Sequence, residues 1–146
     1  MESRAFTLIE LLVTMGIVAV LLAIVIVAIN PARQFAQTNN TRRQSDVKAI
    51  LDAVGQYMVD NKGQIPSGIT TTAQTISKTG ADICAVLVTS YIAALPADPL
   101  TNSGTPITAC SSTYTTGYTI IREASSGRIT VAAPGAELSQ TISVTR

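Results

Sequence analysis

The segment from residue 11 to residue 29, LLVTMGIVAVLLAIVIVAI, has nineteen residues and no charged side chain. At a rise of about 1.5 Å per residue, a helix of this length spans roughly the 30 Å hydrocarbon core of a bilayer. The run is longer than the apolar core of a cleaved secretory signal, and the Pro31-Ala32-Arg33 sequence after it is a poor cleavage site. The sequence therefore predicts a retained membrane-spanning helix near the N-terminus.

Length and composition exclude several classes of protein. A chain of 146 residues is the size of one ordinary domain, which excludes a multidomain enzyme. It has no histidine, so histidine-dependent catalysis and histidine-ligated metal sites are also excluded. Ten basic and nine acidic residues leave a net charge of +1, too small to support broad nucleic-acid binding. Because no phosphate loop or convincing carboxylate pair occurs, we expect no enzyme, no cofactor, no metal and no specific nucleic-acid partner.

The charges and the cysteines give opposite indications of orientation. Arg4 precedes the apolar run, and Arg33, Arg42 and Arg43 are the nearest arginines after it, which by the positive-inside rule alone favours a cytoplasmic C-terminal domain. Cys84 and Cys110 favour export, since an even pair in a small domain suits an oxidising compartment. We expect a disulfide that closes a loop of 27 residues, with two buried free thiols as the alternative.

Glu10 is the least expected residue of the N-terminal segment, because it lies one turn inside the apolar stretch. A carboxylate costs about 2.5 to 3.5 kcal/mol near the centre of a bilayer and less near its edge. One interpretation is a juxtamembrane side chain that reaches back to the lipid headgroups. The other is a side chain with a partner on another chain, which makes Glu10 an assembly residue. The spacing alone does not decide between them.

Residues 5–12, AFTLIELL, and the long apolar helix that follows resemble the class III signal of type IV pilins and type II secretion pseudopilins. In that family a membrane peptidase cuts just before the Phe, the new amine is methylated, and the Glu five residues into the mature chain pairs with a neighbouring N-terminus. The resemblance implies cleavage after Ala5, methylation of Phe6, and an inter-subunit contact between Glu10 and Phe6. Ala5 stands where the family usually has Gly.

The resemblance also implies an organisation, partners and a location. It implies a leader at 1–5, a membrane-spanning and filament-core helix at 6–30, an amphipathic helix at 31–62 and a globular head at 63–146. The expected fold is α+β, with a long N-terminal helix packed on a small antiparallel sheet. The expected partners are copies of the chain, joined through their N-terminal helices, a prepilin peptidase and an inner-membrane assembly platform. The chain then resides in the cytoplasmic membrane before assembly and in an extracellular pilus afterwards.

Two interpretations of Asn30-Pro31 remain open. Pro31 removes a backbone hydrogen bond and predicts a kink or a short melted stretch just before it. Alternatively, Asn30 is an N-cap and Pro31 the first residue of a new helix. Beyond Pro31, apolar residues spaced at 3 and 4 from Val47 to Met58 predict a helical stripe that packs on the head. Residues 37–45, QTNNTRRQS, have no apolar side chain and predict an exposed helical neck.

The head is predicted to be a small sheet. The runs 118–123 and 128–132, joined by ASSG, predict a hairpin, and 138–145 supplies a third strand. Residues 67–80, rich in Thr and Ser, predict an exposed loop. Asp82 is the expected N-cap of a short helix over 82–90, and Lys62-Gly63 is the expected end of the amphipathic helix.

Three functions remain compatible with the sequence. The first is the major subunit of a type IV pilus, and the second is a pseudopilin of a type II secretion system. The third, a membrane-anchored binding domain, is disfavoured by the N-terminal motif. The Leu-Pro-x-Asp-Pro sequence at 95–99 resembles a loop of major pseudopilins, in which Asp98 would join backbone carbonyls around Ca²⁺. No second acidic residue follows until Glu123, so a calcium site is not expected. Glu137 is expected to be a neutral position in assembly.

Overall fold

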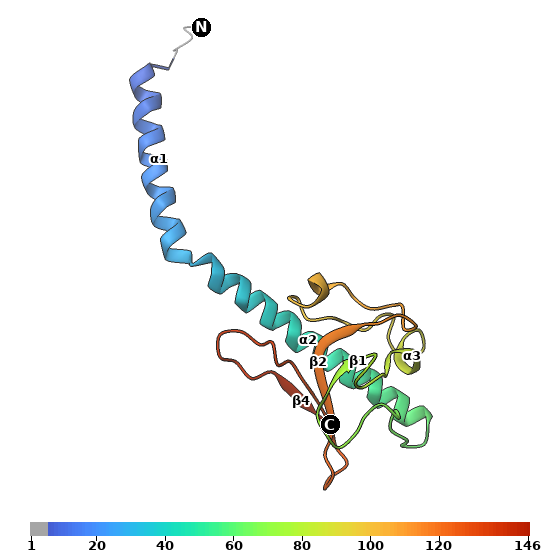
Figure 1. Ribbon diagram of the computed structural model, residues 1–146. Coiled ribbons are helices and arrows are strands. Elements are labelled where there is room, and N and C mark those ends of the chain that lie inside the picture. The colour runs from blue at the N-terminus through green and yellow to red at the C-terminus, as the bar shows by residue number, and fades with distance from the viewer. Residues whose placement is uncertain (1–5) are drawn as a thin grey trace. The chain divides into compact units, whose positions relative to one another are not determined.

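The computed structural model describes residues 6–146 (Figure 1). The leader expected at 1–5, with the cleavage position after Ala5, lies outside the described residues. The chain divides into two compact units, residues 1–35 and 36–146. The elements are α1 (Leu8–Ile29), α2 (Pro31–Asp60), β1 (Gln74–Ser77), α3 (Cys84–Leu87), a 3₁₀ turn η1 (Asn102–Gly104), β2 (Thr115–Arg122), β3 (Ile129–Ala132) and β4 (Ser143–Thr145).

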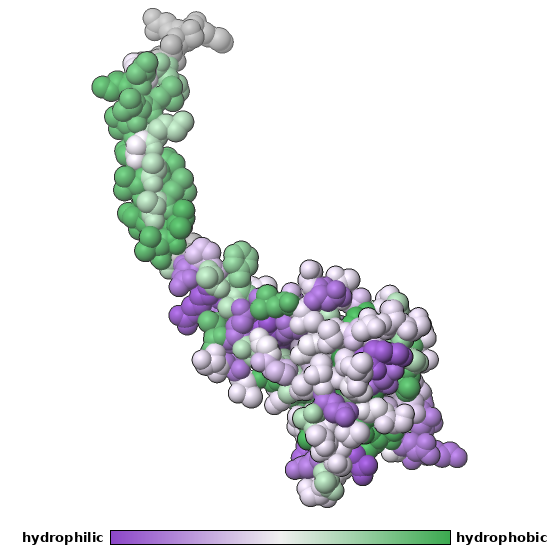
Figure 2. All heavy atoms as spheres, viewed as in Figure 1, coloured by the Kyte–Doolittle hydropathy of each residue, from purple (hydrophilic) through white to green (hydrophobic). Residues whose placement is uncertain are grey.

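Helix α1 is apolar on every side. Thr7 caps its start, and the 21 residues Leu8–Ala28 form a span long and apolar enough to cross a membrane. No side chain in that span is buried within the chain, and Figure 2 shows a surface over α1 that is hydrophobic almost throughout. Because water solvates such a surface poorly, α1 needs lipid or other apolar surface around it.

Asn30 interrupts the helix between α1 and α2. Its backbone is left-handed, with φ 45° and ψ 80°, a conformation that Asn tolerates better than most residues. The Asn30 side-chain oxygen accepts a hydrogen bond from the Arg33 N–H at 3.3 Å, and its carbonyl accepts from the same group at 3.1 Å. Pro31 is the first residue of α2, where its missing N–H leaves no donor unsatisfied. The Asn30 cap and the new helix that begins at Pro31 are those of the second interpretation, and the interruption at Asn30 also fits the melted stretch of the first.

The head is an α+β fold in which one face of α2 joins the core of a four-stranded sheet. The strands follow the order β1-β2-β3-β4, and every neighbouring pair is antiparallel. The predicted apolar stripe of α2 is buried, with Val47, Ile50 and Val54 at 0% exposure. It shares one hydrophobic cluster with side chains of the sheet, among them Ile76, Tyr118, Ile120, Ile129 and Val131. The predicted α+β class is therefore confirmed.

The local predictions for the head are partly right. The hairpin is present as β2 and β3, with Ile120 opposite Val131, and β4 lies within the predicted third strand. The prediction that 67–80 is an exposed loop is wrong for β1, where Ile76 is fully buried. A four-residue strand with one apolar side chain has too short a pattern to be recognised, and only its pairing with β2 defines it.

Two predicted helix ends differ from those observed. Asp82 is not an N-cap, because α3 begins at Cys84 after Ile83 and has no side-chain cap. The Asp82 carboxylate instead accepts hydrogen bonds from Lys78 and Tyr114, each at 2.8 Å. Helix α2 ends at Asp60, and the left-handed turn that follows begins one residue before the expected glycine, at Lys62 with φ 54°.

The expected disulfide is present between Cys84 and Cys110, with the two Cα atoms 5.4 Å apart. It ties α3 to the long segment between η1 and β2. The Cys84 side chain is fully buried, and its N–H donates to the Tyr114 hydroxyl at 3.3 Å. The bond therefore holds a region of the head in which regular secondary structure is sparse.

We predict that the double variant Cys84→Ala, Cys110→Ala lowers the melting temperature of the head by at least about 5 °C, because a loop of this size contributes about 3 to 4 kcal/mol by restricting the unfolded chain. Thermal unfolding of the full chain in detergent, followed by tyrosine fluorescence, measures the change. Mass spectrometry of the non-reduced wild type is the control and should show no alkylatable thiol. An unchanged melting temperature would contradict the prediction.

Candidate assembly site

The residues that the sequence singled out for assembly, Phe6 and Glu10, lie at the start of α1. Phe6 precedes the helix and its side chain is 76% exposed. The Glu10 N–H donates to the Thr7 hydroxyl oxygen at 3.3 Å. The same hydroxyl donates to the Glu10 carboxylate at 3.5 Å. This is a Thr-x-x-Glu arrangement of the capping-box kind. The sequence analysis missed this third arrangement for Glu10, although the Thr-x-x-Glu spacing before an apolar run is its signal.

A small residue opens the surface of α1 one to two turns further along. A side chain at Gly16 would meet no atom within 4 Å, and Gly16 lies in a shallow groove of about 430 Å³. The rest of the groove is formed by Leu12, Val13, Ile17, Val20 and Leu21. Small residues of this kind let apolar helices approach closely. This surface of α1 is therefore suited to contact with another helix.

The neck of α2 carries a buried ionic cluster that the sequence analysis did not foresee. The expectation that residues 37–45 are an exposed neck is right for most of the segment and wrong at two positions, because Asn40 is 2% exposed and Arg43 is fully buried. Among the described residues, Arg43 has the largest fully buried side chain. A run of polar letters does not reveal burial when its partners lie more than fifty residues away in the chain.

The Arg43 guanidinium binds two carboxylates and one amide. Its Nε and Nη2 donate to the two oxygens of Asp98 at 2.6 and 3.1 Å, a bidentate pairing. Its Nη1 donates to Glu137 Oε2 at 2.8 Å and to Asn40 Oδ1 at 2.9 Å. Because Asp98 lies before η1 and Glu137 lies between β3 and β4, one side chain of α2 connects two separate loops of the head.

Asn40 completes the connection to the loop between β3 and β4. Its amide nitrogen donates to the Glu137 carbonyl at 2.8 Å and to Gln140 Oε1 at 3.0 Å, while its oxygen accepts from the Glu137 N–H at 2.9 Å. Asn39 donates to the Glu137 carboxylate at 2.9 Å. Glu137 is therefore a structural residue, and it is unsuitable as the neutral control that the sequence suggested.

The cluster changes the protonation of its members. The hydrogen bond from Arg43 lowers the pKa of Glu137, with a further contribution from Asn39. Burial alone would raise the pKa of Asp98, but hydrogen bonds from Arg43 and from the Leu100 N–H outweigh burial and lower it. The hydrogen bond to Asp98 raises the pKa of Arg43 despite burial. Both carboxylates and the guanidinium are therefore charged at neutral pH.

Asp46, one turn further along α2, lies in a different electrostatic setting. Its carboxylate accepts a hydrogen bond from the Tyr118 hydroxyl at 2.7 Å, and Arg42 lies 3.7 Å away. Burial raises the pKa of Asp46 and outweighs both of these interactions. The contact adds a further connection between α2 and β2.

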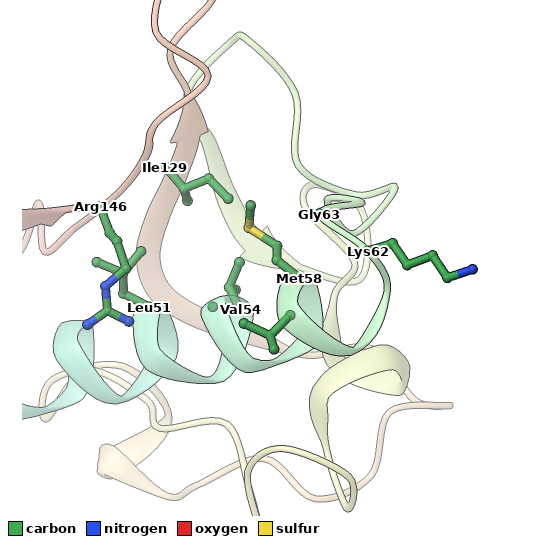
Figure 3. A pocket seen from close by; sticks show the side chains of 9 residues that line it. Leu51, Val54, Met58, Lys62, Gly63, Ile129 and Arg146 are labelled. Atoms are coloured by element: carbon green, nitrogen blue, oxygen red, sulfur yellow. The ribbon is translucent and has the colours of Figure 1, made fainter.

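A groove opens at the far end of α2 (Figure 3). It has a volume of about 520 Å³ and is lined by Leu51, Val54 and Met58 of α2 and by Ile129 at the start of β3. Arg146 lies at its edge and forms an ion pair with Asp52 at 2.8 Å. The groove has no titratable cluster. Among the described residues, no group of three or more Cys, Asp or Glu side chains is arranged to hold a metal ion.

The comparison with known families concerns the N-terminal helix. Residues 1–26 match the family model described as the Prokaryotic N-terminal methylation motif. This motif is the class III signal of type IV pilins and pseudopilins, so the N-terminal segment of the chain carries the signal that is typical of those proteins. Such proteins are structural, are processed by a prepilin peptidase and are anchored in the membrane before assembly. No curated protein and no solved structure matches the chain.

We predict that the head loses stability below about pH 4. Asp98, Asp82 and Glu137 have lowered pKa values when folded, so their contribution is complete above the ordinary values of 3.8 and 4.5 and is lost as the pH falls through the lowered ones. Asp46, with its raised pKa, opposes this trend. Tyrosine-monitored melting between pH 7 and pH 2.5 tests the prediction.

The matched control is Asp98→Asn, which removes one of these titrations. Its melting temperature should be lower than that of the wild type at pH 7 and should fall less between pH 5 and pH 3. A wild-type melting temperature that stays constant or rises over that interval would contradict the assignment of stabilising carboxylates.

Proposed function

We propose that this chain is the major subunit of an extracellular type IV pilus. The observation that carries the proposal is α1, whose 21-residue apolar span has no buried side chain and overlaps the methylation motif matched at residues 1–26. Once such a helix leaves the bilayer, other apolar helices are the surface available to cover it. Copies of α1 then form the core of a filament and the heads lie outside.

The proposed roles of the segments follow their order along the chain. Residues 1–5 are a leader removed after Ala5, residues 6–30 enter the filament core, residues 31–62 link core to head, and residues 63–146 form most of the head. Gly16 supports close packing in the core, because its surface accommodates an approaching side chain. The mature N-terminus is Phe6, methylated on its amine.

A pseudopilin of a type II secretion system is the alternative, and the Leu-Pro-x-Asp-Pro sequence at 95–99 favours it. Two features favour the pilus. The Asp98 carboxylate is bound by Arg43 and is not presented as a free ligand for an ion. The disulfide stabilises the head in an oxidising environment outside the cell, where disulfides persist.

We predict that filaments sheared from the surface of cells producing this chain contain it as their most abundant protein. Electron microscopy and mass spectrometry of the sheared fraction measure this, and the intact mass should correspond to a chain that begins at methylated Phe6. Recovery of the protein only from the cell envelope, with secretion lost on deletion, would favour the pseudopilin. A membrane monomer that forms no assembly would contradict both.

Glu10 is proposed to act between subunits by neutralising the N-terminal amine of Phe6 in the filament core. A buried carboxylate and a buried amine are each unfavourable alone, whereas the ordered pair offsets much of both penalties. Subunits docked out of register leave the two charges unpaired. The pair therefore selects the axial step between subunits even where its net energy is small.

We predict that Glu10→Gln inserts and is processed but reduces filament yield at least about tenfold. Glutamine retains a hydrogen-bonding side chain beside Thr7 and removes only the charge, which separates assembly from helix capping. Immunoblots of sheared and membrane fractions provide the measurement.

The matched control for Glu10 is Thr7→Ala, which removes the cap and keeps the carboxylate. Its filament yield should exceed that of Glu10→Gln. Normal yield from Glu10→Gln together with a defect in Thr7→Ala would show that Glu10 serves only the start of the helix.

A further inference from the structure

The Arg43 cluster is composed like a site for a metal cation, except that the positive charge at its centre is the guanidinium of the chain itself. The guanidinium is fully buried and is surrounded by the oxygens of Asp98, Glu137 and Asn40, four contacts between 2.6 and 3.1 Å. The oxygens come from three segments: α2, the loop before η1 and the loop between β3 and β4. Carboxylate and amide oxygens are the ligands that Ca²⁺ prefers in proteins.

The donor set does not fit Ca²⁺ while Arg43 is present. Both Asp98 oxygens accept from the guanidinium, and one of them also accepts from the Leu100 N–H at 2.9 Å. A second cation at Asp98 would lie against the guanidinium in a buried environment, where like charges repel strongly. The calcium chemistry of the similar pseudopilin loop is therefore absent from the Asp98 site of this head.

Removal of Arg43 would change the balance of charge in the cluster. Asp98 and Glu137 would then lose the cation that binds them both, with only the more distant charge of Arg42 still acting on Asp98, and Asn40 would add a neutral oxygen. Solvent reaches the cluster from the side of Glu137, whose side chain is 31% exposed, whereas the Asp98 side chain is 4% exposed. An ion in solution thus has a route to the oxygens.

We propose that Arg43 is the resident cation of the head: it takes the structural role of a bound calcium ion, fastens the two loops to α2, and makes the fold independent of calcium. Substitution of Arg43 by a small neutral residue converts the cluster into a site for a divalent cation. The inference holds whether the chain builds a pilus or a pseudopilus, so its outcome is separate from that of the filament experiment.

The first arm of the test uses the wild-type full chain in detergent. Its melting temperature is measured by tyrosine fluorescence in EDTA and in 5 mM CaCl₂, with KCl added to equal ionic strength. All four tyrosines lie in the unit formed by residues 36–146, so the signal reports on the head. The two melting temperatures should agree within about 1 °C, because a ligand that does not bind does not stabilise. A rise of several degrees with CaCl₂ would overturn the proposal.

The second arm compares Arg43→Ala with Arg42→Ala. Arg42 is the matched control: it neighbours Arg43, pairs with Asp46 and donates to the Gly104 carbonyl, but its side chain is 43% exposed. In EDTA, Arg43→Ala should melt well below Arg42→Ala. Addition of CaCl₂ should recover at least about 3 °C in Arg43→Ala and nothing in Arg42→Ala.

A double variant, Arg43→Ala with Asp98→Asn, identifies the ligands. It should lose the response to CaCl₂, because the bidentate carboxylate is gone. If Arg43→Ala is unfolded in EDTA, its folding in CaCl₂ is the readout. A variant that remains unfolded in both solutions, or that responds to CaCl₂ no more than Arg42→Ala, would overturn the proposal.

Discussion

The buried guanidinium of Arg43 is the interaction on which the arrangement of the head depends. A fully buried charge is tolerated only when its donors are matched, and here Asp98, Glu137 and Asn40 match them. Removing one partner of such a pair destabilises proteins by about 3 to 5 kcal/mol, because the other charge stays buried. Hydrophobic packing brings α2 and the sheet together, and the ionic cluster specifies which loops lie against the neck of α2.

The two units of the chain differ in whether they bury their own apolar side chains. The head buries its own apolar residues in one cluster and satisfies every buried side-chain polar atom among the described residues. Helix α1 buries none of its 21-residue span. The proposed filament subunit requires both properties, because its head must fold alone while its helix must be covered by lipid or by other helices.

Sequence patterns predicted the elements whose signals are local. The apolar run of α1, the stripe from Val47 onward and the β2–β3 hairpin each have a periodicity or turn signal within a few residues. Strand β1 lacks one, since Ile76 is its single apolar residue. The capping arrangement of Thr7 and Glu10 also has a local signal, the Thr-x-x-Glu spacing before an apolar run.

By itself, the sequence determined an N-terminal helix long and apolar enough to span a membrane and an α+β head without histidine, and its resemblance to a known signal indicated the methylation motif. These features depend on composition and short-range spacing. The tertiary structure alone decided that Arg43 is buried, that Asp98 serves it and that Glu137 is structural. Asp98 lies 55 residues and Glu137 94 residues from Arg43 in the chain, which explains why these contacts could not be predicted from the sequence. No local pattern encodes which loop of a folded head delivers a carboxylate to a polar neck, because that contact exists only once the sheet and α2 have packed.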